Sequence, residues 1–256
     1  LGSALHPSAP PAGCGVPAVS PSVQYSERII NGRNAVPGPW PWQVSSSLFA
    51  PQTSSGSHFC SSSLIDENWV VTAAHCAFDP SSNVVVLREY DLGSNAESVQ
   101  VKTVAKVVTD PGWNSDSLNN DMALLKLSSP AQLAPRASPA SLALPATLRR
   151  VTTGWGRTGT ACTYAAAAPS LPLISRRRCS QHWGNQTTSS MLCAGGIGTS
   201  SCQGDSGRPL VYQNGNTWTR VGIVSWGSSN CNVRTPAVYT RASRFRNRIP
   251  FATLQP

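Results

Sequence analysis

The hydrophobic residues of this chain fall into short runs with the period of β-strands. Val99, Val101 and Val104 alternate with polar neighbours, which is typical of a half-buried strand. Other runs are continuous and lie at 68–72, 84–87, 122–127, 209–212 and 218–226. Clusters of Gly, Pro, Asn and Ser separate the runs and predict turns. The pattern predicts an all-β protein, either a closed antiparallel barrel or a sandwich.

Two segments depart from this pattern. Residues 1–28 are rich in Pro, Ser and Ala and predict an extended leader. Residues 241–249 predict the one helix, and Pro250 would end it.

Composition narrows the class of protein. The chain has 256 residues, of which 40% are hydrophobic and only 12% charged, which favours a soluble, folded chain over disorder. No apolar run is long enough to predict a membrane span. Eight dispersed cysteines include no C-x-x-C pair, which disfavours a zinc ribbon and favours disulfides made in an oxidising compartment. Residues 1–13 lack the features of an intact signal peptide but fit the tail of one, so we expect secretion.

The net charge of +9 comes almost wholly from arginine. The arginines gather at 176–178, at 149–150 and at positions 241, 244, 246 and 248. This pattern fits a surface that binds polyanions, but the solvated faces of a cationic protein explain it better. No aromatic interleaving accompanies the arginines, so we do not expect nucleic acid as a partner.

Three side chains suggest nucleophilic catalysis. Ser206 lies in the glycine-bounded loop Gly-Asp-Ser-Gly before a predicted strand, and a serine hydroxyl needs an imidazole to remove its proton. His75 lies at a strand end beside Cys76, and Asp121 opens the strand at 122–127. The order His, Asp, Ser is one of those found in catalytic triads. Since position 208 is Arg, the motif is not the G-x-S-x-G elbow of α/β-hydrolases.

The residues around these three carry a resemblance. They include Trp-Val-Val-Thr-Ala-Ala-His-Cys ending at Cys76, Asn-Asp-Met-Ala-Leu-Leu-Lys-Leu around Asp121, Ser-Cys-Gln-Gly-Asp-Ser-Gly around Ser206, and Arg-Ile-Ile-Asn-Gly from Arg28. With further motifs across 14–245, the chain resembles the chymotrypsin family of serine proteases, which have the trypsin-like fold. The resemblance implies two antiparallel Greek-key β-barrels (about 29–135 and about 136–256), an active-site cleft between them and a short C-terminal helix.

The resemblance also implies roles. His75 would be the general base, Asp121 would orient it, Ser206 would be the nucleophile, and the N–H groups of Gly204 and Ser206 would form the oxyanion hole. Residues 1–13 would be a leader remnant and 14–28 an activation propeptide. A trypsin-like protease would cleave after Arg28, and the new ammonium of Ile29 would pair with Asp205.

By motif offset, Ser200 resembles the floor of the substrate pocket, and Ser225, Trp226, Gly227 and Ala237 its walls. A neutral floor offers no partner to a substrate Lys or Arg, so we expect cleavage after Phe, Tyr, Trp or Leu. No cofactor is expected. Some relatives bind Ca²⁺ where this chain has Glu89, Asp91 and Glu97, although an exposed acidic loop explains these residues as well.

The resemblance implies the disulfides Cys60–Cys76, Cys179–Cys193 and Cys202–Cys231. A further family disulfide is lost from both ends, because Arg150 and Tyr212 stand at its positions. Ser141 stands where Cys14 would find its usual partner. Cys14 and Cys162 therefore form either a bridge with each other or two free thiols.

Two departures lie near the expected site. Arg208 stands where the family has glycine, and its cation must reach solvent or a carboxylate or else distort the nucleophile loop. Ser61 and Ser62 replace a glycine pair and would crowd Ser206.

Two main hypotheses follow. One is a monomeric secreted serine endopeptidase, made as a zymogen, that acts on polypeptides and meets protein inhibitors. The other is a catalytically impaired homologue that binds anionic surfaces through its arginine-rich face. A secreted β-sandwich binding module would explain the strands but not the joint occurrence of His75, Asp121 and Ser206.

Overall fold

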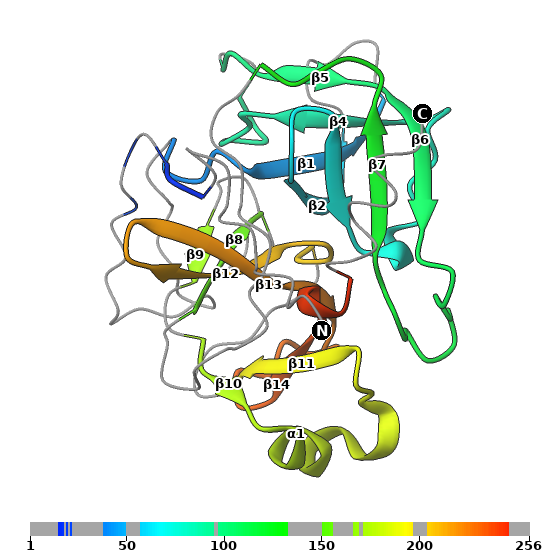
Figure 1. Cartoon of the computed structure of the whole chain (residues 1–256), viewed down its shortest axis with the longest axis vertical. Helices are drawn as coiled ribbons and strands as arrows, with labels where there is room; N and C mark the ends of the chain where they lie inside the picture. Colours follow the sequence, from blue (N-terminus) through cyan, green and yellow to red (C-terminus); the bar gives the residue numbers. More distant parts are fainter. Residues whose placement is uncertain are drawn as a thin grey trace, which may run out of the picture.

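Two curled antiparallel sheets make up the molecule (Figure 1). The computed structural model describes residues 15–17, 19, 21, 38–49, 57–94, 97–132, 150–155, 166–168, 171–196 and 204–245. These residues are mostly strands and turns, which confirms the all-β, two-barrel prediction.

The first sheet follows the order β5-β4-β1-β2-β3-β7-β6. Its continuous apolar runs in β4 and β7 are buried on both faces, whereas β6 is buried only at Val104 and does not show the regular alternation that its valines predicted. A bulge at Ser46 and Ser47 lets β1 pair with β2 and β4 while it curls. Its strands are β1 Gln43–Leu48, β2 Ser57–Leu64, β3 Trp69–Thr72, β4 Asn83–Leu87, β5 Gln100–Lys102, β6 Val104–Thr109 and β7 Ala123–Leu127.

The second sheet follows the order β10-β11-β14-β13-β12-β8-β9. Arg150 lies directly opposite Tyr212 where β8 pairs with β12, so the two positions expected to have lost a disulfide face each other. Its strands are β8 Arg150–Gly154, β9 Ala166–Ala168, β10 Leu173–Ile174, β11 Met191–Gly195, β12 Pro209–Asn214, β13 Thr217–Trp226 and β14 Pro236–Arg241.

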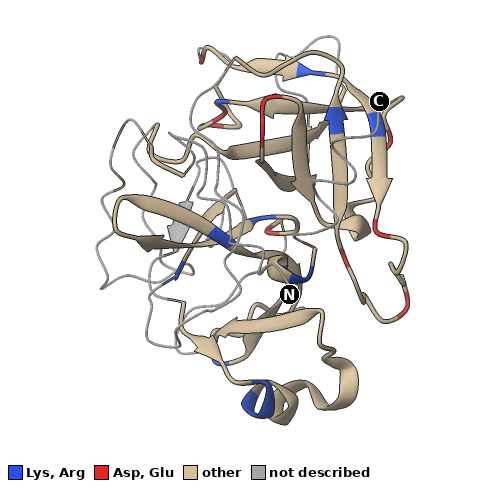
Figure 2. Ribbon diagram, viewed as in Figure 1, with Lys and Arg blue, Asp and Glu red and all other residues tan. Residues whose placement is uncertain are grey.

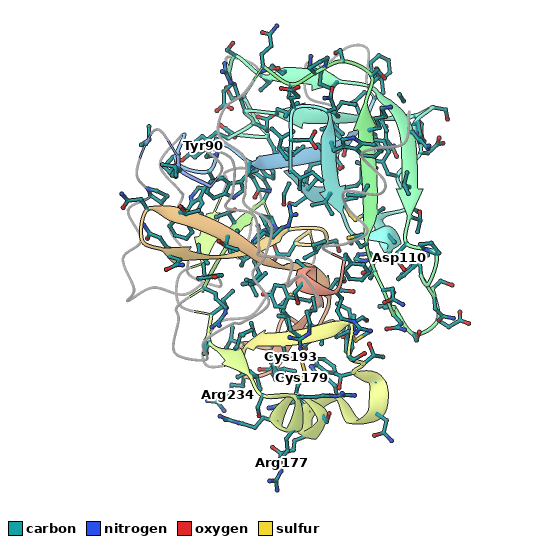
Figure 3. All side chains as sticks on the ribbon, viewed as in Figure 1. Tyr90, Asp110, Arg177, Cys179, Cys193 and Arg234 are labelled. Atoms are coloured by element: carbon teal, nitrogen blue, oxygen red, sulfur yellow. A yellow bond between two sulfur atoms is a disulfide. The ribbon has the colours of Figure 1, made fainter. Side chains whose placement is uncertain are left out.

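The helices differ from the prediction. Arg241 ends β14, residues 242–244 form only the 3₁₀ turn η4 (Ala242–Arg244), and 246–249 lie outside the described residues. An unpredicted helix, α1 (Arg176–Trp183), follows Ser175, whose side chain accepts from the N–H of Arg178. The disulfide Cys179–Cys193 ties α1 to β11 (Figure 3), so a cap and a cross-link support a helix that is too polar to show apolar periodicity.

Aromatic packing joins the two sheets. Trp42 at the start of β1 and Trp218 of β13 are buried in one cluster, and Trp40 stacks edge-on against Trp218 at 5.0 Å between ring centroids. A second buried cluster contains both Ile223 of β13 and Trp69 of β3. Since both clusters draw residues from both sheets, they fix where the loops of one sheet lie against the loops of the other.

We predict that Trp218→Ala lowers the free energy of unfolding by about 3–5 kcal/mol, because it leaves a large cavity where the sheets meet. Urea denaturation followed by circular dichroism measures the change. The control is Val101→Ala on β5, whose side chain is 44% exposed and whose loss should cost about 0.5 kcal/mol or less. Equal effects of the two substitutions would contradict this account of the core.

Candidate active site

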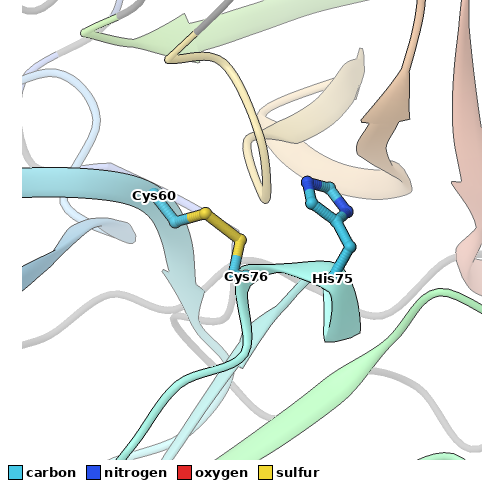
Figure 4. Close-up of side chains that lie close together, drawn as sticks. All are labelled: Cys60, His75 and Cys76. Atoms are coloured by element: carbon cyan, nitrogen blue, oxygen red, sulfur yellow. A yellow bond between two sulfur atoms is a disulfide. The ribbon is translucent and has the colours of Figure 1, made fainter. Parts of the chain in front are cut away.

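His75 lies in the 3₁₀ turn η2 (Ala74–Cys76) directly after β3. The disulfide Cys60–Cys76 holds this turn against β2, beside the imidazole (Figure 4). Among the described residues, Cys60, His75 and Cys76 form the one group of three potential metal ligands. The two sulfurs are bonded to each other, so the group is a cross-link rather than a metal site.

Asp121 is fully buried at the entrance to β7 and holds His75 at two points. Its Oδ1 accepts from the backbone N–H of His75 at 2.8 Å, and its Oδ2 lies 2.7 Å from Nδ1 of the same residue. From the second sheet, the hydroxyl of Ser225 donates to Oδ2, and the hydroxyl of Thr240 donates to the carbonyl of Asp121 at 2.7 Å. The carboxylate is thus satisfied by both sheets, as a buried charge requires.

Ser206 comes from the loop that precedes β12, and its Oγ lies 2.8 Å from Nε2 of His75. Because Asp121 accepts at Nδ1, the proton of the neutral ring belongs there and Nε2 is left to accept from the serine hydroxyl. Such a chain of carboxylate, imidazole and hydroxyl can transfer the serine proton as the oxygen attacks an acyl carbon.

Residues 29–249 match the family model named Trypsin. The chain belongs to the trypsin family. It is a serine endopeptidase, a hydrolase that acts on polypeptide substrates. Trypsin-family enzymes need no cofactor for peptide hydrolysis. Members of the family are usually secreted. Within the part of the chain that the structure describes, no helix has the length and apolar character needed to cross a bilayer.

In this trypsin-family chain, Ser61 and Ser62 stand where a glycine pair was expected. They do not separate Ser206 from His75. Ser61 and Ser62 are fully buried, and the hydroxyl of Ser62 bonds that of Ser46 at 2.7 Å. The N–H of Ser61 donates to the carbonyl of Ser206 at 2.8 Å. A Cβ at Gly207 would lie 2.0 Å from the carbonyl oxygen of Ser61, so the close approach requires glycine at 207. The crowding expected from the two serines is absent at this contact.

The side chain of Arg208 is directed into the protein interior, where it pairs with the carboxylate of Asp205. Its side chain is fully buried, and Nη1 lies 2.8 Å from Oδ1 of Asp205. It therefore does not lie between Ser206 and His75, whose polar atoms are in hydrogen-bond contact. Arg28 and Ile29, which the sequence links to Asp205, lie outside the described residues.

The expected pocket walls are partly described. Ala237 is buried in β14 opposite Ala194 of β11. Trp226 stacks edge-on against Trp183 of α1 at 4.9 Å, while Gly227 is exposed. Ser225 also has a role that the sequence did not indicate, because its hydroxyl donates to Asp121; its place in the pocket wall stays a prediction. The expected floor, Ser200, lies outside the described residues.

Glu89, Asp91 and Glu97 do not belong to the one group of described residues whose ligand atoms lie close enough together to share a metal ion. Both carboxylate oxygens of Glu97 accept backbone N–H groups, from Tyr90 at 2.8 Å and Asp91 at 3.2 Å, and Oδ1 of Asp91 accepts from Gly93. Burial, and then the charge of Glu97, raise the pKa of Glu89 to about 7. Glu97 and Asp91 thus bond backbone groups of their own turn.

The expected disulfides stand as follows. Cys60–Cys76 and Cys179–Cys193 are formed, and Cys231 is disulfide-bonded. Its expected partner Cys202 lies outside the described residues, as do Cys14, Cys162 and Ser141.

Arginines gather at the outer end of the second sheet. Arg176, Arg177 and Arg178 are exposed on α1, whose ribbon is coloured as basic residues in Figure 2, and Figure 3 shows Arg177 projecting outward. Burial, followed by the charges of Arg176 and Arg244, lowers the pKa of Arg241. Positive charge is therefore concentrated around α1 and η4, away from the disulfide beside His75.

Behind the nucleophile loop lies His58 of β2, which sequence reasoning missed. Its Nδ1 bonds the hydroxyl of Ser45 at 2.7 Å, and its ring lies 5.3 Å from that of Trp155. Burial, and then the charge of Arg208, lower the pKa of His58 to about 4, against a smaller opposing effect of the Gly204 backbone. The ring is therefore neutral at physiological pH.

We predict that His58 makes the fold sensitive to acid. Between about pH 6.5 and 4 the unfolded chain binds a proton at this position that the folded chain does not, so the free energy of unfolding falls as the pH falls through this window. The contribution is at most about 3 kcal/mol. Glu89 acts in the opposite direction, because its raised pKa makes stability fall as the pH rises from 4.5 to about 7.

Comparing His58→Gln with the parent chain cancels the contribution of Glu89. Urea denaturation at pH 7, 5.5 and 4.5 should show a smaller loss of stability on acidification in the variant. His182→Gln, at an exposed position of α1, is the matched control for loss of an imidazole. Parallel pH curves for His58→Gln and the parent chain would contradict the prediction.

Proposed function

We propose that Ser206, His75 and Asp121 form the catalytic triad of this endopeptidase. His75 takes the proton of Ser206 as its Oγ attacks the scissile carbonyl, and then gives that proton to the leaving amine. Water enters next, and the same imidazole activates it against the acyl-enzyme. Asp121 keeps the proton of the neutral ring on Nδ1 and stabilises the imidazolium. The observation that carries this proposal is the contact of 2.8 Å between Oγ of Ser206 and Nε2 of His75.

The N–H groups of Gly204 and Ser206 are proposed to bind the oxyanion of the tetrahedral intermediate. Each such donor contributes about 3 kcal/mol to the transition state. Two backbone bonds support the placement of these donors, namely those from Ser61 to Ser206 and from Gly207 to the carbonyl of Val224 at 2.9 Å.

The proposed specificity is for large apolar residues before the cut. Ser200, as a neutral floor, leaves a substrate Lys or Arg without a counter-charge and therefore disfavours basic residues. Trp226 and Ala237 would bound the sides, with Ala237 narrowing the pocket relative to a glycine.

We further propose that the enzyme is secreted as a monomer and processed after Arg28 by a trypsin-like protease. Residues 1–13 would be the leader remnant, 14–28 the propeptide and 29–256 the peptidase domain. Protein inhibitors that offer a loop to the active site would be its other partners.

The impaired-homologue hypothesis is the weaker alternative. It depended on Arg208 and on Ser61 and Ser62 disturbing the nucleophile. Arg208 is instead buried against Asp205, and Ser61 bonds the backbone of Ser206. The exposed arginines of α1 are compatible with either hypothesis and do not favour the homologue.

We predict that a fluorophosphonate probe labels the trypsin-treated chain at Ser206. Ser206→Ala abolishes labelling, and His75→Ala slows it at least about 1,000-fold, because the hydroxyl loses its base. Ser129→Ala, at an exposed position, is the control that keeps full labelling. Mass spectrometry of the labelled peptide identifies the site. A folded, treated parent chain that stays unlabelled would refute the proposed function.

We predict that peptide substrates with Phe or Tyr before the cut are hydrolysed at least about 100-fold faster than those with Arg or Lys, measured as kcat/KM. Ser200→Asp should lower the kcat/KM for the Phe substrate about tenfold or more, because a carboxylate would be desolvated beside an apolar side chain. Faster cleavage after Arg by the parent chain would show that the pocket is basic-specific.

Chelation by EDTA should leave the melting temperature and kcat/KM unchanged, because the acidic residues of this loop do not bring three ligand atoms together among the described residues. Differential scanning calorimetry with EDTA and with added Ca²⁺ makes the measurement. A rise of several degrees on adding Ca²⁺ would show that the acidic loop does bind the ion.

A further inference from the structure

Asp205, the residue before the nucleophile, is in contact with a cation from its own loop. Oδ1 of Asp205 and Nη1 of Arg208 lie 2.8 Å apart, and neither side chain has any exposed surface. A carboxylate without solvent requires a partner of opposite charge. In this chain Arg208 supplies that charge from three residues away.

The guanidinium occupies a space shaped to receive it. The side chain of Arg208 runs over Gly154 at the end of β8, where a Cβ would lie 2.2 Å from Nε. Any other residue at 154 would displace the arginine. On another side lies His58, whose depressed pKa leaves it uncharged next to the cation. The arginine is thus part of the packed interior and not a side chain that happens to fold inward.

The loop that carries the ion pair is bonded along its length. The N–H of Arg208 donates to the carbonyl of Asp205 at 3.1 Å, and Val224 of β13 exchanges bonds with Gly207 and Arg208, both at 2.9 Å. With the ion pair in place, Oγ of Ser206 is 2.8 Å from His75. Residues 205–208 are therefore ordered, with Ser206 in contact with His75, in the same structure in which Asp205 is paired with Arg208.

After cleavage, the ammonium of Ile29 would be a second cation near the Asp205–Arg208 pair. An ammonium freed at Ile29 would enter a desolvated site where Asp205 is already neutralised, and two like charges beside one carboxylate repel each other. The new N-terminus consequently has little to gain from Asp205.

We propose that Arg208 is a positioning residue that acts as an internal counter-ion for Asp205, so that the nucleophile loop is ordered and the enzyme is active before any cleavage after Arg28. This inference rests on the proposed serine-protease function. It differs from the expected zymogen in one measurable respect, namely the activity of the uncleaved chain.

The first test compares the uncleaved variant Arg28→Gln with the trypsin-treated parent chain, each confirmed by mass spectrometry. We expect kcat/KM for a Phe substrate, and the rate of fluorophosphonate labelling, to agree within about tenfold. An active cleaved parent with a silent Arg28→Gln would overturn this proposal while leaving the proposed function intact. A cleaved parent that is itself silent would refute both.

The second test removes the cation. In the Arg28→Gln background, Arg208→Gly should lower the labelling rate at least about 100-fold, and Arg208→Lys should retain part of it, because the loss of a buried counter-ion disorders the loop. Arg220→Met, which removes a different buried arginine on β13, is the matched control and should keep labelling. Unchanged labelling of the Arg208→Gly variant would overturn the proposal.

The pH dependence of kcat/KM distinguishes a positioning role of Arg208 from a general loss of folding. Because it is measured on trypsin-treated chains, it applies even if the uncleaved Arg208→Gly variant folds poorly. The kcat/KM of the trypsin-treated parent should not fall between pH 8 and about pH 10, because a guanidinium stays charged there. Treated Arg208→Gly should regain activity through the Ile29 ammonium and lose it again as that amine deprotonates. A parent profile that falls as an amine titrates would show that Ile29, and not Arg208, holds Asp205.

Discussion

The proposed active site depends on one buried carboxylate that both sheets must satisfy. Asp121 has no exposed surface, so its charge is tolerated only while His75 and Ser225 bond to it. His75 comes from the first sheet and Ser225 from the second, and Thr240 adds a bond to the Asp121 carbonyl. The aromatic clusters that press the sheets together therefore also complete the environment of the carboxylate. A shift between the sheets would remove the bond from Ser225 and leave the carboxylate with His75 alone.

A second buried carboxylate, beside the proposed nucleophile Ser206, is also matched by a cation. Asp205 and Arg208 form an ion pair without solvent, and His58 next to them remains neutral. Breaking such a pair costs far more than the pair contributes, since an isolated buried charge remains. Residues 205–208 are thus held by electrostatics as well as by the backbone bonds to Val224 and Ser61.

Much of the architecture was predictable from the sequence because strands leave a local signal. The runs at 68–72, 84–87 and 218–226 correspond to β3, β4 and β13 within a residue or two. The approach of His75, Asp121 and Ser206 was predictable only through motifs, because no local pattern brings together residues up to 131 positions apart. Helix α1 was missed, since a serine cap and a disulfide stabilise it rather than an apolar face. For Arg208 the sequence indicated that its charge needed a partner, but the choice of Asp205 depends on burial that only the fold defines.

The contact between Arg208 and Gly154 constrains how this sequence can have changed over time. The arginine lies where a Cβ on residue 154 would be, so a side chain at 154 and an arginine at 208 exclude each other. A lineage that acquired Arg208 must have had glycine at 154 already, and from then on that glycine could not drift. Residues 154 and 208, although distant in the chain, are therefore coupled, because a side chain at 154 requires that Arg208 be lost first.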